Sequence, residues 1–155
     1  QTFLILAMMV GQGPKPDTDE LAELIDNLPR SVRLHHVLAD GGFDSEANHR
    51  YLREEHGVLT TIPPVIGRPT DKPPTGKYRA LMTKAFHLRP YGDRWHAETT
   101  NSMIKRNQGS AIRARKYHAK NREMRLAVLT HNIAILLRID LFDRAGQEPM
   151  IARRQ

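Results

Sequence analysis

The apolar residues fall into short runs separated by amphipathic stretches, a pattern that predicts strands alternating with helices. An apolar run and two mixed segments that contain apolar residues predict strands over 2–10, 33–39 and 58–62. The first run is continuously apolar, so we expect it to be a strand buried on both faces. Between these predicted strands, apolar residues recur at intervals of three and four, which predicts helices over 19–27 and 45–56. The alternation as a whole predicts an α/β domain with one mixed sheet flanked by helices.

The second half of the chain is predicted to be mainly helical. A stretch rich in proline and glycine, 63–76, excludes regular structure and predicts a long loop. A short helix is predicted over 78–87. The longest helix, over 121–141, is apolar almost all round and is therefore expected to be central to the core. Residues 143–155 are expected to be a tail, so that the domain covers 1–142.

Asp40 follows the strand predicted over 33–39 and precedes two glycines. Ligands bind outside the carboxyl ends of strands in open sheets of this type, which favours a functional role. An aspartate before glycine is also a common turn former, and the residues around it leave both interpretations open. Asp44 is the favoured cap of the next helix, with Ser45 competing for that position, and Thr18 is expected to cap the first helix.

The composition of the chain indicates one globular domain and an acidic binding partner. A chain of 155 residues with 39% hydrophobic content suits one globular domain. Its 24 lysines and arginines against 17 acids give a formal charge of +7, which indicates an acidic partner, most commonly nucleic acid. In the basic stretch 109–120, a role facing DNA and a solvated run of charge are equally compatible with the sequence. The absence of cysteine excludes disulfides and cysteine-type zinc sites, and no apolar run approaches the roughly 20 residues of a membrane span.

Polar residues between Tyr91 and Lys105 recur at helical spacing. With Arg94 at zero and about 100° per residue, Glu98 falls at about 40° and Lys105 at about 20°. One stripe of a helix expected to begin near Asp93 therefore carries a carboxylate between two cations, with Tyr91 at its edge. A pair such as Arg94 and Glu98 also occurs on ordinary helix surfaces, so the pair alone does not indicate a function.

Taken together, the four residues Tyr, Arg, Glu and Lys are separated by two, three and six residues. This pattern resembles the C-terminal motif of DDE transposases of the IS4/IS5 insertion-sequence type. The segment Leu38–Ser45 is similar to the strand-end segment of that family, which carries its second catalytic aspartate, here Asp40. The two segments occur in the family's order and the resemblance covers nearly the whole chain. It implies an RNase H-like mixed sheet flanked by helices.

The resemblance also implies the chemistry of DNA transposition, in which phosphodiester cleavage and strand transfer at insertion-sequence ends depend on Mg²⁺ or Mn²⁺. Asp40 and Glu98 would be catalytic residues and metal ligands, and their carboxylates are then expected within roughly 4–8 Å of each other. Four residues would contact DNA: Tyr91, Arg94, Lys105 and Trp95. For Trp95, packing within the protein is the alternative.

The family's first catalytic aspartate has no counterpart here, because Asp17, Asp19 and Asp26 follow the opening apolar run instead of preceding it. We therefore expect the C-terminal part of the catalytic domain, without its first strands and inactive by itself. The resemblance implies a cytoplasmic, nucleoid-associated protein of a bacterium or archaeon, with terminal-repeat and target DNA as partners and a homodimer left open. The alternative is a non-catalytic basic DNA-binding remnant.

Overall fold

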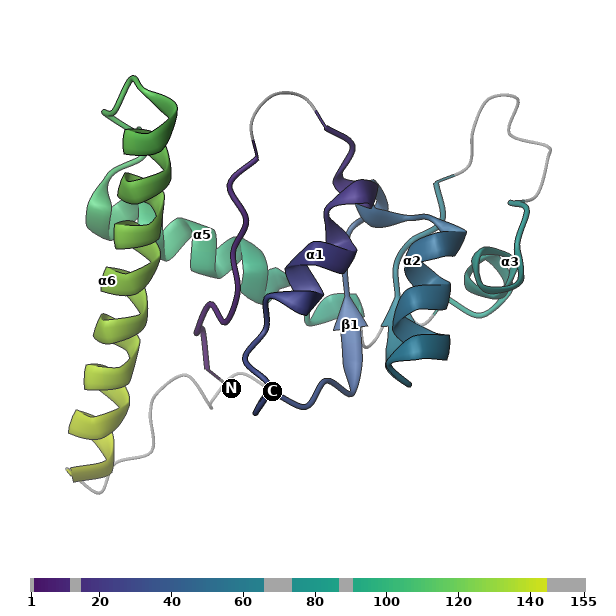
Figure 1. The fold of residues 1–155 in the computed structure, drawn as a ribbon. Helices are drawn as coiled ribbons and strands as arrows, with labels where there is room; N and C mark the ends of the chain where they lie inside the picture. The colour runs from purple at the N-terminus through teal and green to yellow at the C-terminus, as the bar shows by residue number, and fades with distance from the viewer. Residues whose placement is uncertain (1, 12–14, 66–73, 87–90, 145–155) are drawn as a thin grey trace. The chain divides into compact units, whose positions relative to one another are not determined.

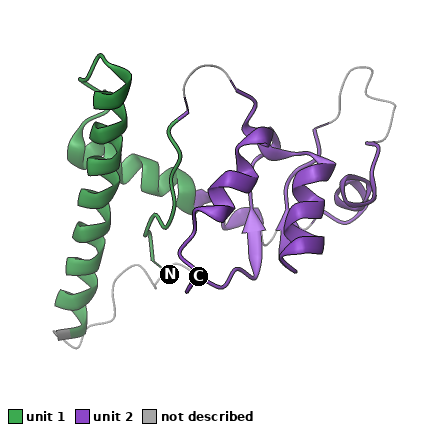
Figure 2. Ribbon diagram, in the orientation of Figure 1, with its two compact units in different colours: residues 1–10, 96–155 green, residues 11–95 purple. Residues whose placement is uncertain are grey.

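The computed structural model divides into two compact units, which Figure 2 distinguishes by colour. Unit 1 comprises 1–10 and 96–155, and unit 2 comprises 11–95. The structure describes four ranges of the chain: 2–11, 15–65, 74–86 and 91–144. Of the predicted tail, 143 and 144 belong to the last helix and 145–155 lie outside these residues, as does most of the predicted loop over 63–76.

Unit 2 alternates short helices with two strands (Figure 1). In chain order its elements are η1 (Asp17–Asp19), α1 (Leu21–Asp26), β1 (His36–Leu38), η2 (Gly41–Phe43), α2 (Glu46–Arg50), the π-helical turn η3 (Tyr51–Glu55), β2 (Leu59–Thr61) and α3 (Lys77–Lys84). In unit 1 the long helix is α6 (Tyr117–Arg144), and α5 (Trp95–Gln108) begins at the last residue of unit 2.

β1 and β2 pair in parallel, with His36 opposite Leu59 and Leu38 opposite Thr61. Parallel neighbours need a crossover connection, and α2 followed by η3 provides it. Both predicted strands are therefore confirmed, although each pairs over only three residues. The result is a small α/β unit whose sheet places Asp40 just beyond the end of β1.

Ser45 and Gly57 mark the two ends of the crossover helix. The Ser45 hydroxyl accepts a hydrogen bond from the Asn48 N–H at 3.0 Å and caps α2, so Ser45 is the cap and the prediction for Asp44 is wrong. Gly57 follows η3 with a φ of 67°, the left-handed conformation that ends helices. The predicted cap Thr18 is also wrong, because no side chain caps η1 or α1 and the Thr18 hydroxyl donates to Asp19 instead.

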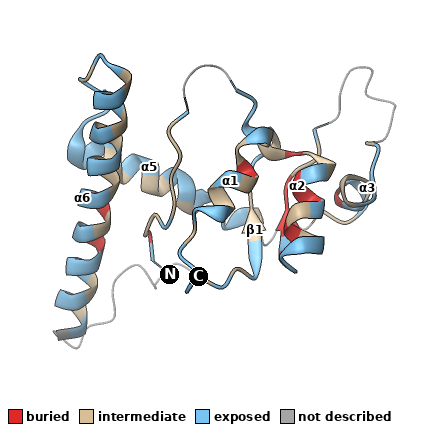
Figure 3. Cartoon of the chain, in the orientation of Figure 1, coloured by how far each residue is buried: buried red, intermediate tan, exposed pale blue. Residues whose placement is uncertain are grey.

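The core of unit 2 lies between α1, η3 and the strands. Leu21, Leu52 and Val58 are almost completely buried, and partly buried apolar side chains surround them. Figure 3 shows buried positions on α1 and α2 of this unit. Burial of these side chains stabilises the segment that leads from β1 into the crossover, each contributing roughly 1.5–3 kcal/mol before entropy is counted.

The prediction of a strand over 2–10 is wrong, because side chains of α6 take the place of a neighbouring strand. Asn132 accepts a hydrogen bond from the Ile5 N–H at 2.9 Å and donates to the Ile5 carbonyl at 2.8 Å. His131 Nε2 lies 2.7 Å from the Phe3 carbonyl and is buried, so this histidine is a packing residue. The apolar run is thus an extended segment held along one side of a helix.

α6 contains the whole predicted helix 121–141 and begins four residues earlier. The prediction that it is central to a core is wrong: among its described side chains only His131 and Ile135 are buried. Its exposed apolar residues are Leu126, Leu129, Ile133, Leu136, Leu137 and Leu141. No helix in the described part of the chain has the length and apolar character needed to cross a membrane.

Candidate active site

Asp40 lies two residues beyond β1, at the carboxyl end of a parallel strand. Its Oδ1 accepts a hydrogen bond from the Gly42 N–H at 2.9 Å and caps η2. The Ala39 N–H donates to the Thr61 carbonyl at 3.3 Å, so sheet pairing holds the backbone up to the residue before Asp40. The side chain is exposed. Asp40 is therefore both the turn former and an accessible carboxylate at a strand end.

Asp17 is a second carboxylate beside the same turn. A Cβ built on Gly42 would lie 2.8 Å from Asp17 Oδ2 and 3.0 Å from Asp40 Oδ1. The two carboxylates therefore both lie close to the α-carbon of Gly42. Because these acids are far apart in sequence, their spacing carried no signal of this proximity.

Tyr91 and Arg94 form a cation–π pair at the start of the motif. The Arg94 guanidinium carbon lies 5.5 Å from the centroid of the Tyr91 ring, and the Phe86 ring packs against the same tyrosine with centroids 5.0 Å apart. Trp95, the first residue of α5, is 48% exposed. The motif helix thus begins two residues later than predicted, and Arg94 precedes it in a turn.

Glu98 and Lys105 lie on α5, in its first and last turns. Both are exposed, and a spacing of seven residues places them on the same side of the helix, about 10 Å apart along its axis. This part of the predicted stripe is confirmed. Asp40 belongs to unit 2 and Glu98 to unit 1, so the separation of their carboxylates stays a prediction.

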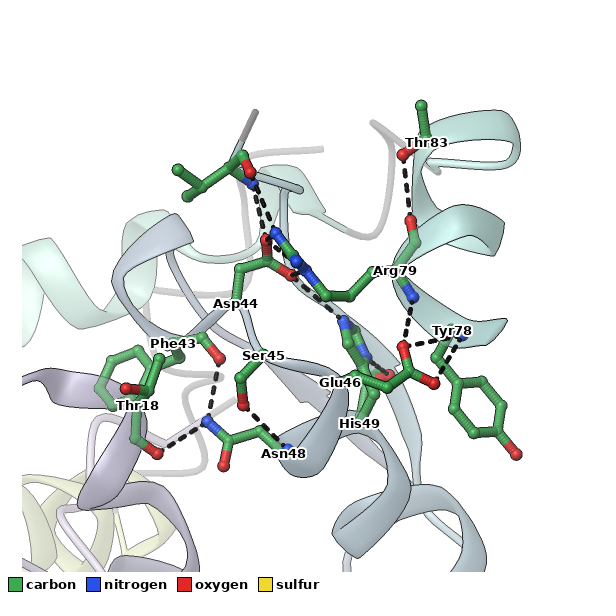
Figure 4. A network of polar contacts seen from close by, with 12 residues as sticks. Thr18, Phe43, Asp44, Ser45, Glu46, Asn48, His49, Tyr78, Arg79 and Thr83 are labelled. Atoms are coloured by element: carbon green, nitrogen blue, oxygen red, sulfur yellow. Dashed lines mark hydrogen bonds and ion pairs between the residues drawn. The ribbon is translucent and has the colours of Figure 1, made fainter. Parts of the chain in front are cut away.

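A buried ion pair connects the segment after β1 to α3 (Figure 4). The Asp44 side chain is completely buried, and Arg79 donates to it from Nε at 3.0 Å and from Nη2 at 2.7 Å. The Val65 N–H also donates to this carboxylate at 2.7 Å. Glu46 adds a second connection, because it accepts hydrogen bonds from the N–H groups of Tyr78 and Arg79 at the start of α3. Sequence analysis missed this network, whose members come from distant segments.

His49 lies beside this network and is completely buried. Its Nδ1 is 2.7 Å from the Thr60 hydroxyl, which also accepts a hydrogen bond from Arg53 Nε at 2.6 Å. Its Nε2 is 3.8 Å from Asp44 Oδ1, too far for a hydrogen bond. Burial lowers the pKa of His49 below its ordinary value of 6.5, although the Asp44 charge opposes the shift.

This lowered pKa predicts that stability falls as the pH falls through the mildly acidic range. Below 6.5 the unfolded chain takes up a proton that His49 in the folded protein still excludes. The stability due to neutral His49 is therefore present above about pH 6.5 and is lost progressively below it. We expect urea unfolding midpoints to decrease from about pH 7.5 to about pH 5.5. His49→Gln should flatten that dependence, whereas His35→Gln, a change at an exposed histidine, should preserve it.

The described residues contain no group of three or more histidine, aspartate or glutamate side chains able to hold a metal ion. Mg²⁺ in nucleotidyl-transfer sites is commonly held by one or two carboxylates, with waters and substrate phosphates completing its shell. Accessible Asp40 fits such a ligand, since only one of its oxygens caps the turn. The donor chemistry is thus compatible with a hard divalent cation.

Comparison with protein families gives a match to the transposase DDE domain over residues 1–133. No curated protein and no solved structure was found to match the chain. The matched range contains both the turn at Asp40 and the motif from Tyr91 to Lys105. Transposases act on DNA, and their DDE domains generally use divalent metal ions. Since the match covers most of the sequence, this chain belongs to the transposase DDE domain family.

Proposed function

We propose that the chain forms the Asp40 and Glu98 part of an IS4/IS5-type transposase, which cuts the ends of an insertion sequence and joins them to target DNA. The family match over both carboxylates carries this proposal. The accessible position of Asp40 at a strand end supports it, as does the position of Glu98 two helical turns from Lys105. The proposal includes an RNase H-like fold, with which the parallel pair β1–β2 and its helical crossover are compatible.

In this proposal Asp40 and Glu98 would hold Mg²⁺ or Mn²⁺. The bound metal would activate the attacking oxygen and stabilise the leaving oxygen. Arg94 and Lys105 neutralise phosphates on either side of the reacting bond. Tyr91 contributes an aromatic face for a DNA base or a hydroxyl for a phosphate. Its contact with the Arg94 guanidinium restricts both side chains before DNA arrives.

Metal removal tests the proposal. The protein is assayed alone and joined to whatever its reading frame encodes upstream, on a labelled duplex that contains the insertion-sequence end. We expect the joined protein to nick this duplex in Mg²⁺ and to lose nicking by at least about 1,000-fold in EDTA, since the metal contributes several kcal/mol at the transition state. A gel-shift measurement in EDTA should still show binding. Nicking that persists unchanged in EDTA would rule out the proposed chemistry.

The alternative is a non-catalytic DNA-binding protein. The formal charge of +7 favours it as much as it favours a transposase. The same assay separates the two functions, because a binding protein would shift the duplex without nicking it in either form and with either metal.

A further inference from the structure

The positive charge of the chain is concentrated in one segment of unit 1. Residues 105–125 carry eight of the 24 lysines and arginines and one of the 17 acids, so the remaining 16 cations and 16 acids cancel. The whole formal charge of +7 therefore lies in this segment. All eight basic side chains are exposed, and none of them pairs with a carboxylate in the described part of the chain.

The single acid of this segment, Glu123, holds the preceding loop against α6. Its two carboxylate oxygens accept hydrogen bonds from the N–H groups of Arg113 and Ala114, each at 2.8 Å. These two bonds lower the pKa of Glu123, which keeps it ionised. One turn further along the helix, the Ala127 carbonyl accepts a hydrogen bond from Gln108 Nε2 at 2.9 Å. The loop is thus fixed to α6 at Glu123, and the end of α5, from which the loop starts, is fixed at Ala127.

The anchored backbone sets the positions of four cations. Arg113 and Arg115 are exposed on either side of the half-buried Ala114, the alternation expected of an extended backbone. Lys120 is three residues before Glu123, so helical geometry places it on the side of α6 that holds the loop. Lys116 directly precedes α6, and its carbonyl accepts a hydrogen bond from the Lys120 N–H at 2.9 Å. The acid on this side is bonded to backbone N–H groups, which leaves these cations available for an external anion.

We propose that the basic loop, residues 109–120, binds the phosphate backbone of duplex DNA and adds affinity that does not depend on base sequence. The inference rests on the proposed function only in taking DNA as the partner, and it does not require Asp40 or Glu98 to be catalytic. A prearranged set of cations loses less conformational entropy on binding than mobile side chains on a mobile loop. Binding to phosphates releases counterions, so it has a measurable dependence on salt.

The test measures binding of the 155-residue protein to a labelled random-sequence duplex by fluorescence anisotropy over a series of salt concentrations. The loop variant carries Arg113→Gln, Arg115→Gln, Lys116→Gln and Lys120→Gln. We expect its slope of log K against log salt to be smaller by about 0.9 for each phosphate that the variant no longer neutralises, and therefore by about 2–4 in total. At low salt its affinity should fall by at least about tenfold.

A matched control removes the same charge from exposed positions of unit 2, with Lys15→Gln, Arg30→Gln, Arg33→Gln and Lys84→Gln. We expect the control to keep nearly the full slope, and urea unfolding confirms that both variants are folded. Equal decreases in the two variants would overturn the loop assignment while leaving the proposed function intact. Failure of the unsubstituted protein to bind the duplex at any salt concentration would overturn both the loop assignment and the DNA partner.

Discussion

Glu98→Gln is expected to reduce nicking by about 1,000-fold or more in whichever form of the protein nicks the duplex. Glutamine keeps the size of the side chain but removes the charge that a divalent cation requires. Metal-assisted stabilisation of the transition state amounts to several kcal/mol, and each 1.4 kcal/mol is a factor of ten in rate. The measurement is single-turnover nicking of an insertion-sequence end, with binding to the same duplex measured in parallel.

Binding should change little, because Glu98 contributes no positive charge to the DNA contact. Glu55→Gln is the matched control, since it makes the same chemical change at an exposed position of unit 2, and it should nick normally. Asp40→Asn should reproduce the loss of nicking seen for Glu98→Gln. Normal nicking by Glu98→Gln would remove the catalytic assignment and favour the DNA-binding alternative.

Arg79→Met is expected to destabilise unit 2 by about 3 kcal/mol, the lower end of the range for breaking a buried ion pair. The Asp44 carboxylate is completely buried, while Arg79 is partly exposed. Removal of the guanidinium leaves that carboxylate with the Val65 N–H as a hydrogen-bond donor but without a cation. Urea unfolding followed by circular dichroism gives the change in free energy.

Arg50→Met provides the matched control for this second prediction. Arg50 pairs with Glu54 at 3.2 Å, but both side chains are largely exposed, and such pairs contribute about 0–1 kcal/mol. Adding Asp44→Asn to Arg79→Met should recover part of the stability, because no buried charge then remains. Similar small effects of the two arginine substitutions would show that the Asp44 ion pair contributes little.

The sequence by itself determined the features that depend on neighbouring residues. The apolar character of residues 121–141 predicted the longest helix, and apolar residues at intervals of three and four predicted the crossover helix over 45–56. The apolar residues before Asp40 predicted a strand that places this acid at its carboxyl end. The spacing from Tyr91 to Lys105 predicted the family through a resemblance, and the family match confirms its DDE transposase part. These signals are local, because they arise from backbone geometry over one or two turns.

Tertiary contacts decided what each element packs against. The apolar run 2–10 has the composition of a strand, yet its backbone bonds to His131 and Asn132 from the far end of the chain. Asp44 has the local character of a helix cap, but Arg79 pairs with it in a buried site while Ser45 caps the helix. The local sequence limits which hydrogen bonds a segment can form. Which partner it bonds to depends on the distant groups that the fold brings next to it, because leaving a buried polar group unpaired costs free energy.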